Sequence, residues 1–342
     1  MGHHVAVRVW QLTQPAGADG LTLAERDDPT PGPREVLVRT RAVSLNHRDL
    51  LVVRGVYSKR VRPRLVPCSD AAGEVVAVGD GVSSVRAGDR VTTTFIPGWL
   101  DGPCPTGASR TAPGAGDVNG VLAEAIVVPE HGIMPAPSHL SFEEASTLPC
   151  AMLTAWHALF EEAPPPTPAT VLTLGTGGVS VGAVQMALAG GLRVIATSSQ
   201  DDKLDRVRAL GVTDVINYRE VGTWGDRARE LTGGAGVDNV IEVGGQGTLQ
   251  QSLRAVRAGG TVSLIGVLSG HAPVDLTPVL MRNVRLQGVL VGSHAMYRRM
   301  TSALTAWRLR PIVDRIVPFS NAPEAFRHLA SGRHLGKVVI AV

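Results

Sequence analysis

Short apolar runs, several of which alternate with polar residues, fill the first 130 positions, and Gly, Pro and Asp separate them. This pattern predicts β-strands joined by turns. The strands are expected at residues 6–11, 36–43, 73–78, 90–95 and 123–128. Residues 97–120 are rich in Gly and Pro and predict a long exposed loop. Residues 141–162 predict a helix, in which Ser141 and Glu144 have the spacing of a capping box.

The pattern changes after the three prolines at 164–166, and strand-like runs then alternate with helix-like segments. Six strands are expected, at residues 170–174, 192–197, 214–217, 237–243, 261–266 and 284–291. Such an alternation predicts a doubly wound parallel sheet, and therefore an α/β protein. Residues 301–330 are predicted to be helical, and residues 337–342 to form a final strand.

A glycine turn follows the first of these six strands. Gly175, Gly177 and Gly178 precede an apolar helix that starts at Val179. Glycines at this position let the backbone approach a pyrophosphate closely, and the helix start directs free N–H groups at it. The turn therefore predicts a dinucleotide site. Ser180 stands where the strict fingerprint has its third glycine.

Composition narrows the class of protein. The 342 residues are enough for two domains, and 44% hydrophobic with 18% charged residues is typical of a soluble protein. A net charge of +3 does not indicate a nucleic-acid partner, and no apolar run reaches the ~18 residues of a membrane span. Three widely spaced cysteines, and a strand-like pattern near the first residue that leaves no room for a signal peptide, indicate a cytoplasmic protein.

Several motifs along the chain resemble those of the medium-chain dehydrogenase/reductase superfamily, in its zinc-free alcohol dehydrogenase-like or quinone oxidoreductase-like branch. The motifs are LNHRDL at 45–50, PCSDAAGEV at 67–75, AGDRV at 87–91, LPCAMLTAW at 148–156, the glycine turn, and GKV at 336–338. The resemblance implies a GroES-like catalytic domain of residues 1–151 and 291–342, around a Rossmann domain of residues 152–290. It also implies that nicotinamide and substrate bind between the two domains.

The same resemblance argues against a metal. The positions of the three catalytic zinc ligands match Asn46, Ser69 and Cys150, and only Cys150 keeps its type. Zinc needs about three nitrogen, sulfur or carboxylate ligands from the protein, so no zinc is expected. The four-cysteine structural lobe is also missing, because residues 97–120 contain only Cys104. The positions of the usual proton relay match Arg48 and Leu51.

The zinc-free members of the superfamily that this chain resembles are mostly NADPH-dependent reductases. Many of them act on the C=C bond of an enone or quinone. Hydride addition to such a substrate leaves an enolate, which a few hydrogen bonds can support. This is the leading hypothesis for the function. Two alternatives stay open: an alcohol or carbonyl dehydrogenase on the same scaffold, and a protein that binds NADPH without turnover.

NADPH is favoured over NADH because Ser198 ends the second strand of the predicted sheet, where NAD enzymes carry an acid. Ser199 and Lys203 are spaced to reach a 2′-phosphate, and Tyr218 resembles the tyrosine that covers it in quinone reductases. Asp201 and Asp202 are the evidence against this interpretation. The further cofactor contacts expected from motif position are Asn46, His47, Thr154, Gly244, Gly266, Val291 and Lys337.

Asn46, Asp70 and Cys150 are expected beside the lost zinc position and are, with Tyr57, the candidate catalytic residues. Tyr57 could donate a proton, although its reference pKa is near ~10, and solvent is the alternative donor. Trp99 is a candidate pocket wall. Five cations lie between residues 54 and 64, which indicates either a solvated surface or an anionic or carrier-bound substrate; they are Arg54, Lys59, Arg60, Arg62 and Arg64. The predicted edge strand at 284–291 favours a homodimer or tetramer.

Overall fold

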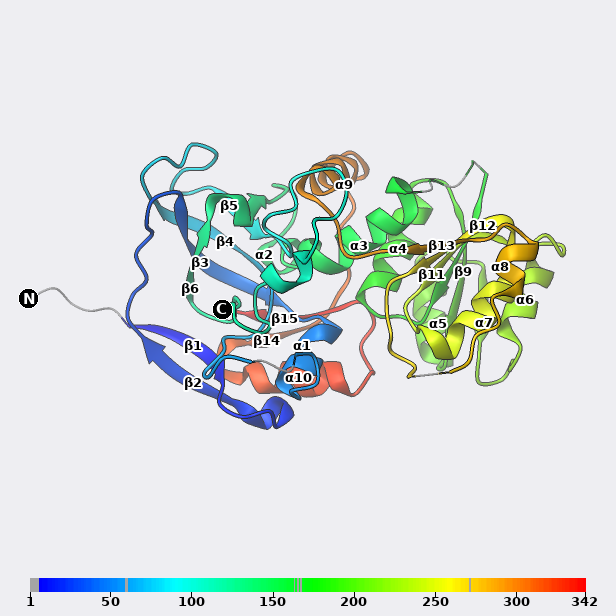
Figure 1. Ribbon diagram of the computed structural model, residues 1–342, viewed down its shortest axis with the longest axis horizontal. Coiled ribbons are helices and arrows are strands. Elements are labelled where there is room, and N and C mark those ends of the chain that lie inside the picture. Colours follow the sequence, from blue (N-terminus) through cyan, green and yellow to red (C-terminus); the bar gives the residue numbers. More distant parts are fainter. Residues whose placement is uncertain (1–5, 59–60, 163, 165, 167, 271) are drawn as a thin grey trace, which may run out of the picture. The chain divides into compact units, whose positions relative to one another are not determined.

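The computed structural model describes residues 6–58, 61–162, 164, 166, 168–270 and 272–342 (Figure 1). Lys59 and Arg60, two of the five cations noted above, lie outside the described residues. The chain divides into two compact units. Unit 1 consists of Met1–Ala151 and Gly292–Val342, and unit 2 is Met152–Val291. The second boundary therefore falls after Val291, not before it.

Unit 1 is built on a seven-stranded sheet with the order β14-β15-β3-β4-β5-β7, in which β6 pairs with β3. A separate hairpin of β1 and β2 packs on the same core. The strands are β1 (Val7–Leu12), β2 (Leu21–Arg26), β3 (Glu35–Ser44), β4 (Asp70–Val78), β5 (Arg90–Thr93), β6 (Ala125–Pro129), β7 (Ile133–Pro135), β14 (Val313–Pro318) and β15 (Lys337–Ala341). Because β15 pairs antiparallel with β3, the two ends of the chain share one sheet.

The helices of unit 1 cover this sheet and carry part of its core. They are α1 (His47–Val53), α2 (Phe142–Ala145), α9 (His294–Trp307) and α10 (Ala322–Ala330). Phe326 and Leu329 of α10 pack on Val338 and Ile340 of β15 in one buried cluster. Tyr297 anchors α9, because its hydroxyl lies 2.7 Å from the Thr92 hydroxyl on β5.

Several elements of unit 1 differ from the sequence predictions. The strands β2 and β7 and the helix α1 were not predicted, and β14 interrupts the predicted helix 301–330. Val313, Ile316 and Val317 are β-branched and the segment ends at Pro318, which suits an edge strand paired with β15 better than a helix. The loop 97–120 is not fully exposed, since residues 112–115 are buried.

The predicted helix 141–162 is real but irregular. Its capping box is confirmed: the Glu144 N–H donates to Ser141 Oγ at 3.2 Å, and the Ser141 N–H donates to Glu144 Oε2 at 2.8 Å. Two wider π-helical turns, Leu148–Met152 and His157–Glu161, flank α3 (Leu153–Trp156). Pro149 has no N–H to give to a regular helix, and this accounts for the first of the two turns.

Unit 2 confirms the doubly wound sheet. Its six parallel strands have the order β10-β9-β8-β11-β12-β13, the arrangement of a Rossmann fold. The strands are β8 (Thr170–Leu174), β9 (Arg193–Ser198), β10 (Asp214–Asn217), β11 (Val237–Glu242), β12 (Val256–Leu264) and β13 (Arg285–Gly288). Besides α3, the α-helices described in this unit are α4 (Gly178–Ala189), α5 (Asp201–Arg208), α6 (Trp224–Leu231), α7 (Gln246–Ala255) and α8 (Thr277–Met281). β13 lies at the edge, as predicted.

Among the described residues, none of the helices combines the length and the apolar character that crossing a membrane requires. The three cysteines are free thiols. Cys68 is buried, Cys104 is exposed and Cys150 is half-buried.

Candidate active site

The candidate active site of unit 1 starts where β3 gives way to α1. Asn46 has an extended backbone and caps the helix. Its N–H donates to Asp49 Oδ2 at 2.7 Å, which closes the first turn. An Asn followed three residues later by an acid is a helix-start pattern, so the spacing of Asn46 and Asp49 is the signal that could have predicted α1.

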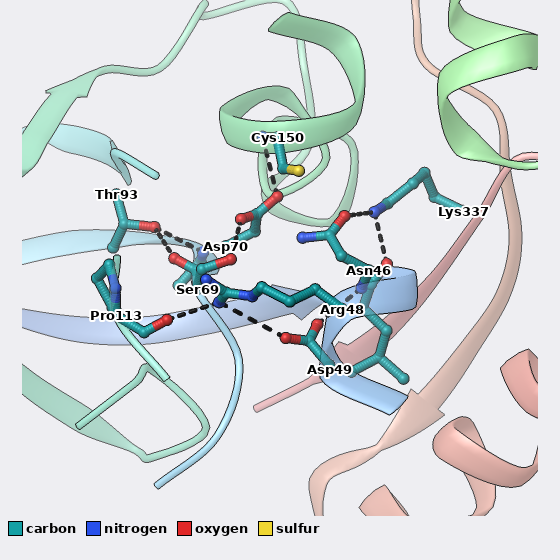
Figure 2. Close-up of polar contacts among 11 residues, drawn as sticks. Asn46, Arg48, Asp49, Ser69, Asp70, Thr93, Pro113, Cys150 and Lys337 are labelled. Carbon is teal, nitrogen blue, oxygen red and sulfur yellow. Dashed lines mark hydrogen bonds and ion pairs between the residues drawn. The ribbon is translucent and has the colours of Figure 1, made fainter. Parts of the chain in front are cut away.

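Lys337, the first residue of β15, fixes the side chain of Asn46. Its ammonium group donates to the Leu45 carbonyl oxygen at 2.5 Å and to Asn46 Oδ1 at 2.6 Å, and only 5% of the residue is exposed. An ammonium group has donors only, so the amide must present its oxygen to Lys337 and turn its nitrogen away. Asn46 Nδ2 has no hydrogen-bond partner among the described residues, and it points to the side where Asp70 and Cys150 lie (Figure 2).

Asp70, at the start of β4, is the central acceptor of this cluster. It is fully buried. Its carboxylate accepts the Ser69 hydroxyl at 2.6 Å and the Cys150 N–H at 3.0 Å. Burial raises the pKa of Asp70, and Lys337, Ser69 and Asn46 oppose that rise. The carboxylate thus joins β4 to the turn that carries Cys150.

The Cys150 side chain is a neutral thiol in these surroundings. Burial, and then the Asp70 carboxylate, raise its pKa to about 12. A thiolate is the form that attacks carbon or binds a metal, so a thiol with this pKa is a poor nucleophile at neutral pH.

The donor set at the expected zinc position does not fit zinc. Asn46 offers an amide oxygen that Lys337 already occupies, Ser69 offers a hydroxyl that is donated to Asp70, and Cys150 is the one sulfur ligand of the three. A buried ammonium group beside the site also opposes a divalent cation. In the part of the chain that the structure describes, no group of three His, Cys, Asp or Glu side chains is arranged to hold a metal.

Arg48 and Asp49 form a second, buried pair that the sequence analysis did not identify as part of the site. The Arg48 guanidinium donates to the Pro113 carbonyl oxygen at 2.6 Å, and its Nη2 lies 3.7 Å from Asp49 Oδ1. Burial raises the pKa of Asp49 to about 6, against the charge of Arg48. The Arg48 guanidinium also lies over the rings of Phe95, at 4.5 Å, and of Tyr57, at 5.7 Å. The candidate proton donor Tyr57 is therefore beside Arg48, with 39% of its surface exposed.

In unit 2 the glycine turn has the features of a phosphate-binding loop. Gly175 has φ of +70°, and a Cβ added at Gly175 or Gly177 would meet no atom within 4 Å. These glycines therefore leave open space before α4, whose first N–H groups have no partner in their own helix. Ser180 is accommodated because its hydroxyl donates to the Leu174 carbonyl oxygen at 2.7 Å.

The residues that were assigned to the 2′-phosphate lie around the end of β9. Ser198 is buried, and its carbonyl oxygen accepts the Tyr218 N–H at 3.0 Å, which brings the start of the next loop beside it. Tyr218 is exposed and Lys203 is buried on α5. Ser199 is half-buried, next to Ser198. Asp201, the counter-evidence, accepts a hydrogen bond from Asn217 at 2.9 Å.

The structure places four other predicted contacts in unit 2. Thr154 is buried on α3, and Val291 is buried with φ of +51°, an unfavourable value for a β-branched residue. The Val291 carbonyl oxygen lies 2.8 Å from His157 Nδ1. Gly244 gives its N–H to the buried Glu242 carboxylate at 2.7 Å. Gly266 packs so closely on Val243 that a Cβ would lie 2.0 Å from that carbonyl oxygen.

His47 and Trp99 remain in unit 1. His47 is the first residue of α1 and is exposed. Trp99 is buried, and its indole N–H donates to the Gly102 carbonyl oxygen at 2.9 Å. Lys337, an expected cofactor contact, has its ammonium group buried against Leu45 and Asn46 in unit 1.

Family models match both parts of the chain. Residues 32–138 match the alcohol dehydrogenase GroES-like domain, and residues 178–306 match the zinc-binding dehydrogenase model. The second range includes none of Asn46, Ser69 and Cys150, so the match does not bear on the metal.

Relatives cover nearly the whole chain. A zinc-type alcohol dehydrogenase-like protein of Schizosaccharomyces pombe is 40% identical over 96% of both chains. The crystal structure of a putative alcohol dehydrogenase from Sinorhizobium meliloti is 42% identical, with a TM-score of 0.92 over 100% of both chains. A crystal structure described as an NAD-dependent alcohol dehydrogenase is 34% identical, with a TM-score of 0.89 over 98% of this chain and 99% of that one. The chain thus belongs to the medium-chain dehydrogenase/reductase superfamily of NAD(P)-dependent oxidoreductases.

Proposed function

We propose that this protein is a zinc-independent, NADPH-dependent reductase of an activated C=C bond, in an enone or a quinone-like substrate. The observation that carries the proposal is the hydrogen bond from the buried Lys337 ammonium group to Asn46 Oδ1. It places a cation behind an amide whose nitrogen faces the Asp70 carboxylate and has no hydrogen-bond partner within 3.5 Å among the described residues. The position of a zinc ligand thus carries a neutral N–H donor.

An amide N–H donor with a cation behind it suits an enolate oxygen. Hydride addition to the β-carbon of an enone moves the π electrons of the C=C bond toward the carbonyl oxygen, and the α-carbon then takes a proton. The negative charge is shared between carbon and oxygen, so it needs less stabilisation than the localised charge of an alkoxide. Donors that are fixed in advance at a developing oxyanion are among the strongest contributors to catalysis.

The cofactor fits the residues of unit 2. The open space at Gly175 and Gly177 and the free N–H groups of α4 would hold the pyrophosphate, and Ser198, Ser199, Lys203 and Tyr218 would surround the 2′-phosphate. Ser198 supports NADPH because a carboxylate at that position would repel this phosphate. Bound there, the nicotinamide supplies the hydride.

Tyr57 and solvent remain the two candidate sources of the proton. The Tyr57→Phe variant separates them, because it removes the hydroxyl and keeps the ring beside Arg48. A fall in kcat of more than about tenfold would support Tyr57 as the donor. An unchanged kcat would support solvent.

The function is tested by NADPH oxidation with a panel of cyclic enones, quinones and aldehydes, and by NADP⁺ reduction with secondary alcohols. Reduction of enones or quinones that leaves aldehydes untouched supports the proposal. Turnover of aldehydes or alcohols alone identifies an alcohol or carbonyl dehydrogenase. NADPH binding without turnover of any member of the panel points to a binding protein.

A further inference from the structure

Arg48 is a buried cation with unused hydrogen-bond donors. A guanidinium group carries five N–H donors, one on Nε and two on each Nη. Nη2 donates to the Pro113 carbonyl oxygen at 2.6 Å. Nε and Nη1 have no hydrogen-bond partner among the described residues, and only 8% of Arg48 is exposed. Three of its donors, one on Nε and two on Nη1, are thus buried without a protein partner among the described residues, and native proteins rarely leave such donors without water or a ligand.

The nearby carboxylate does not satisfy these donors. Asp49 uses Oδ2 for the Asn46 N–H, and its Oδ1 lies 3.7 Å from Arg48 Nη2 and has no hydrogen-bond partner among the residues described. Asp49 therefore balances part of the charge and leaves the Nε and Nη1 donors unbound.

Two aromatic rings contact Arg48, and they differ in how much solvent they meet. Phe95, at 4.5 Å from the guanidinium, is 5% exposed, whereas Tyr57, at 5.7 Å, is 39% exposed. The side of Arg48 that Tyr57 covers is therefore closer to solvent than the side that Phe95 covers. Arg54, Arg62 and Arg64 are exposed nearby in the chain, and none of them pairs with a carboxylate in the described part of the molecule. Their field attracts an anion.

Arg48 also belongs to the same helical turn as Asn46, the donor proposed for the substrate oxygen. Figure 2 shows the two side chains leaving the start of α1 into one polar cluster around Ser69 and Asp70. A substrate that places its carbonyl oxygen at Asn46 therefore has a cation within the same site.

We infer that Arg48 binds a carboxylate of the substrate, so that the protein acts on enones that carry a carboxylate. Arg48 is then a residue that determines specificity and takes no part in hydride or proton transfer. A carboxylate fits because its two oxygens accept hydrogen bonds from neighbouring guanidinium donors. The inference rests on the proposed enone reductase function for its substrate class, while the binding of a carboxylate at Arg48 stands on the contacts alone.

The test compares 4-oxo-2-pentenoate with its methyl ester, which has the same enone and no charge. The wild-type protein is expected to prefer the acid in kcat/KM. Arg48→Met should lower kcat/KM at least about 100-fold for the acid and less than about threefold for the ester. Arg48→Lys, which keeps the charge and loses the planar donors, should fall between. Arg86→Met, which removes an exposed charge on the same unit, is the control and should change neither value.

Binding of the saturated acid 4-oxopentanoate, measured by calorimetry, separates the two claims. Binding to the wild type and none to Arg48→Met, without turnover of any enone, would support the Arg48 site and refute the reductase. Equal kcat/KM for acid and ester in the wild type, together with no binding of 4-oxopentanoate, would refute the Arg48 site and leave the reductase standing. If Arg48→Met does not fold, the wild-type acid-to-ester ratio and Arg48→Lys decide the matter in the same way.

Discussion

Lys337 and Asn46 are 291 positions apart, yet the ammonium group of the first lies 2.6 Å from the amide oxygen of the second. The antiparallel pairing of β15 with β3 creates this contact, because Lys337 starts β15 and Asn46 follows β3. The sequence motif alone suggested a cofactor contact for Lys337, and the two roles lead to different outcomes on mutation.

We predict that Lys337→Met lowers kcat about tenfold to hundredfold, because the Asn46 amide loses the partner that fixes its orientation. The Kd for NADPH should stay within about twofold of the wild type, since the ammonium group points into unit 1. Lys337→Arg keeps a cation and should retain most of kcat. Stopped-flow kinetics and fluorescence titration measure both constants. A tenfold rise in Kd with an unchanged kcat would instead identify Lys337 as a pyrophosphate contact.

The second prediction is that the purified protein carries no stoichiometric zinc. Asn46, Ser69 and Cys150 supply one sulfur atom and two oxygens that already have partners. Elemental analysis of protein prepared without chelators should find much less than one zinc per chain, and a chelator should leave activity unchanged. One zinc per chain, with loss of activity on chelation, is the result that contradicts it.

Local sequence patterns predicted unit 2 well and the site of unit 1 less well. The alternation of strands and helices, like the glycine turn at Gly175, is a pattern of consecutive residues and can be recognised locally. The contacts of Arg48 and Lys337 depend on segments far apart in the chain, namely the loop at Pro113 and the last strand. The sequence motif indicates only a lost proton relay at Arg48, because no local signal shows that its guanidinium is buried. The sequence did point to Asn46, Asp70 and Cys150 as neighbours, which the structure brings together.

We predict that NADPH binds at least about tenfold more tightly than NADH, which corresponds to about 1.4 kcal/mol. Ser198, at the end of β9, leaves room for the 2′-phosphate without a repelling charge. Ser198→Asp should reverse the preference, and Ser199→Ala, a smaller change beside it, should only reduce it. Isothermal titration with both cofactors checks this. Equal affinities in the wild type would refute the assignment.

The buried carboxyl of Asp49 should make stability depend on pH. Its pKa is about 6 in the folded protein, above the ordinary value of 3.8, so the folded state binds the proton more tightly than the unfolded state. Its contribution to the free energy of unfolding is therefore greatest at low pH and is lost as the pH rises from about 4 to about 6, by up to about 3 kcal/mol. Asp49→Asn lacks this loss, so its stability relative to the wild type should increase over that interval. Urea unfolding at pH 4.5 and pH 7 measures the difference, and parallel pH profiles of the two proteins would show that Asp49 titrates normally.

The last prediction concerns β13, the edge strand of unit 2. A strand edge with unpaired N–H and C=O groups favours pairing with a second copy, and we expect a homodimer on this edge. The Val289 N–H donates to the Leu264 carbonyl oxygen of β12 at 2.9 Å, so a proline at Val289 would damage the sheet itself. Alternation along the strand directs the Gly288 N–H away from β12, and a Cβ at Gly288 meets no atom within 4 Å.

Gly288→Pro should therefore remove an outward donor and weaken the dimer, while the fold, followed by circular dichroism, stays intact. Gly288→Ala keeps the donor and is the control. Light scattering at micromolar concentration measures the mass, and a monomeric wild type, or a dimer that is indifferent to Gly288→Pro, would exclude this edge as the interface.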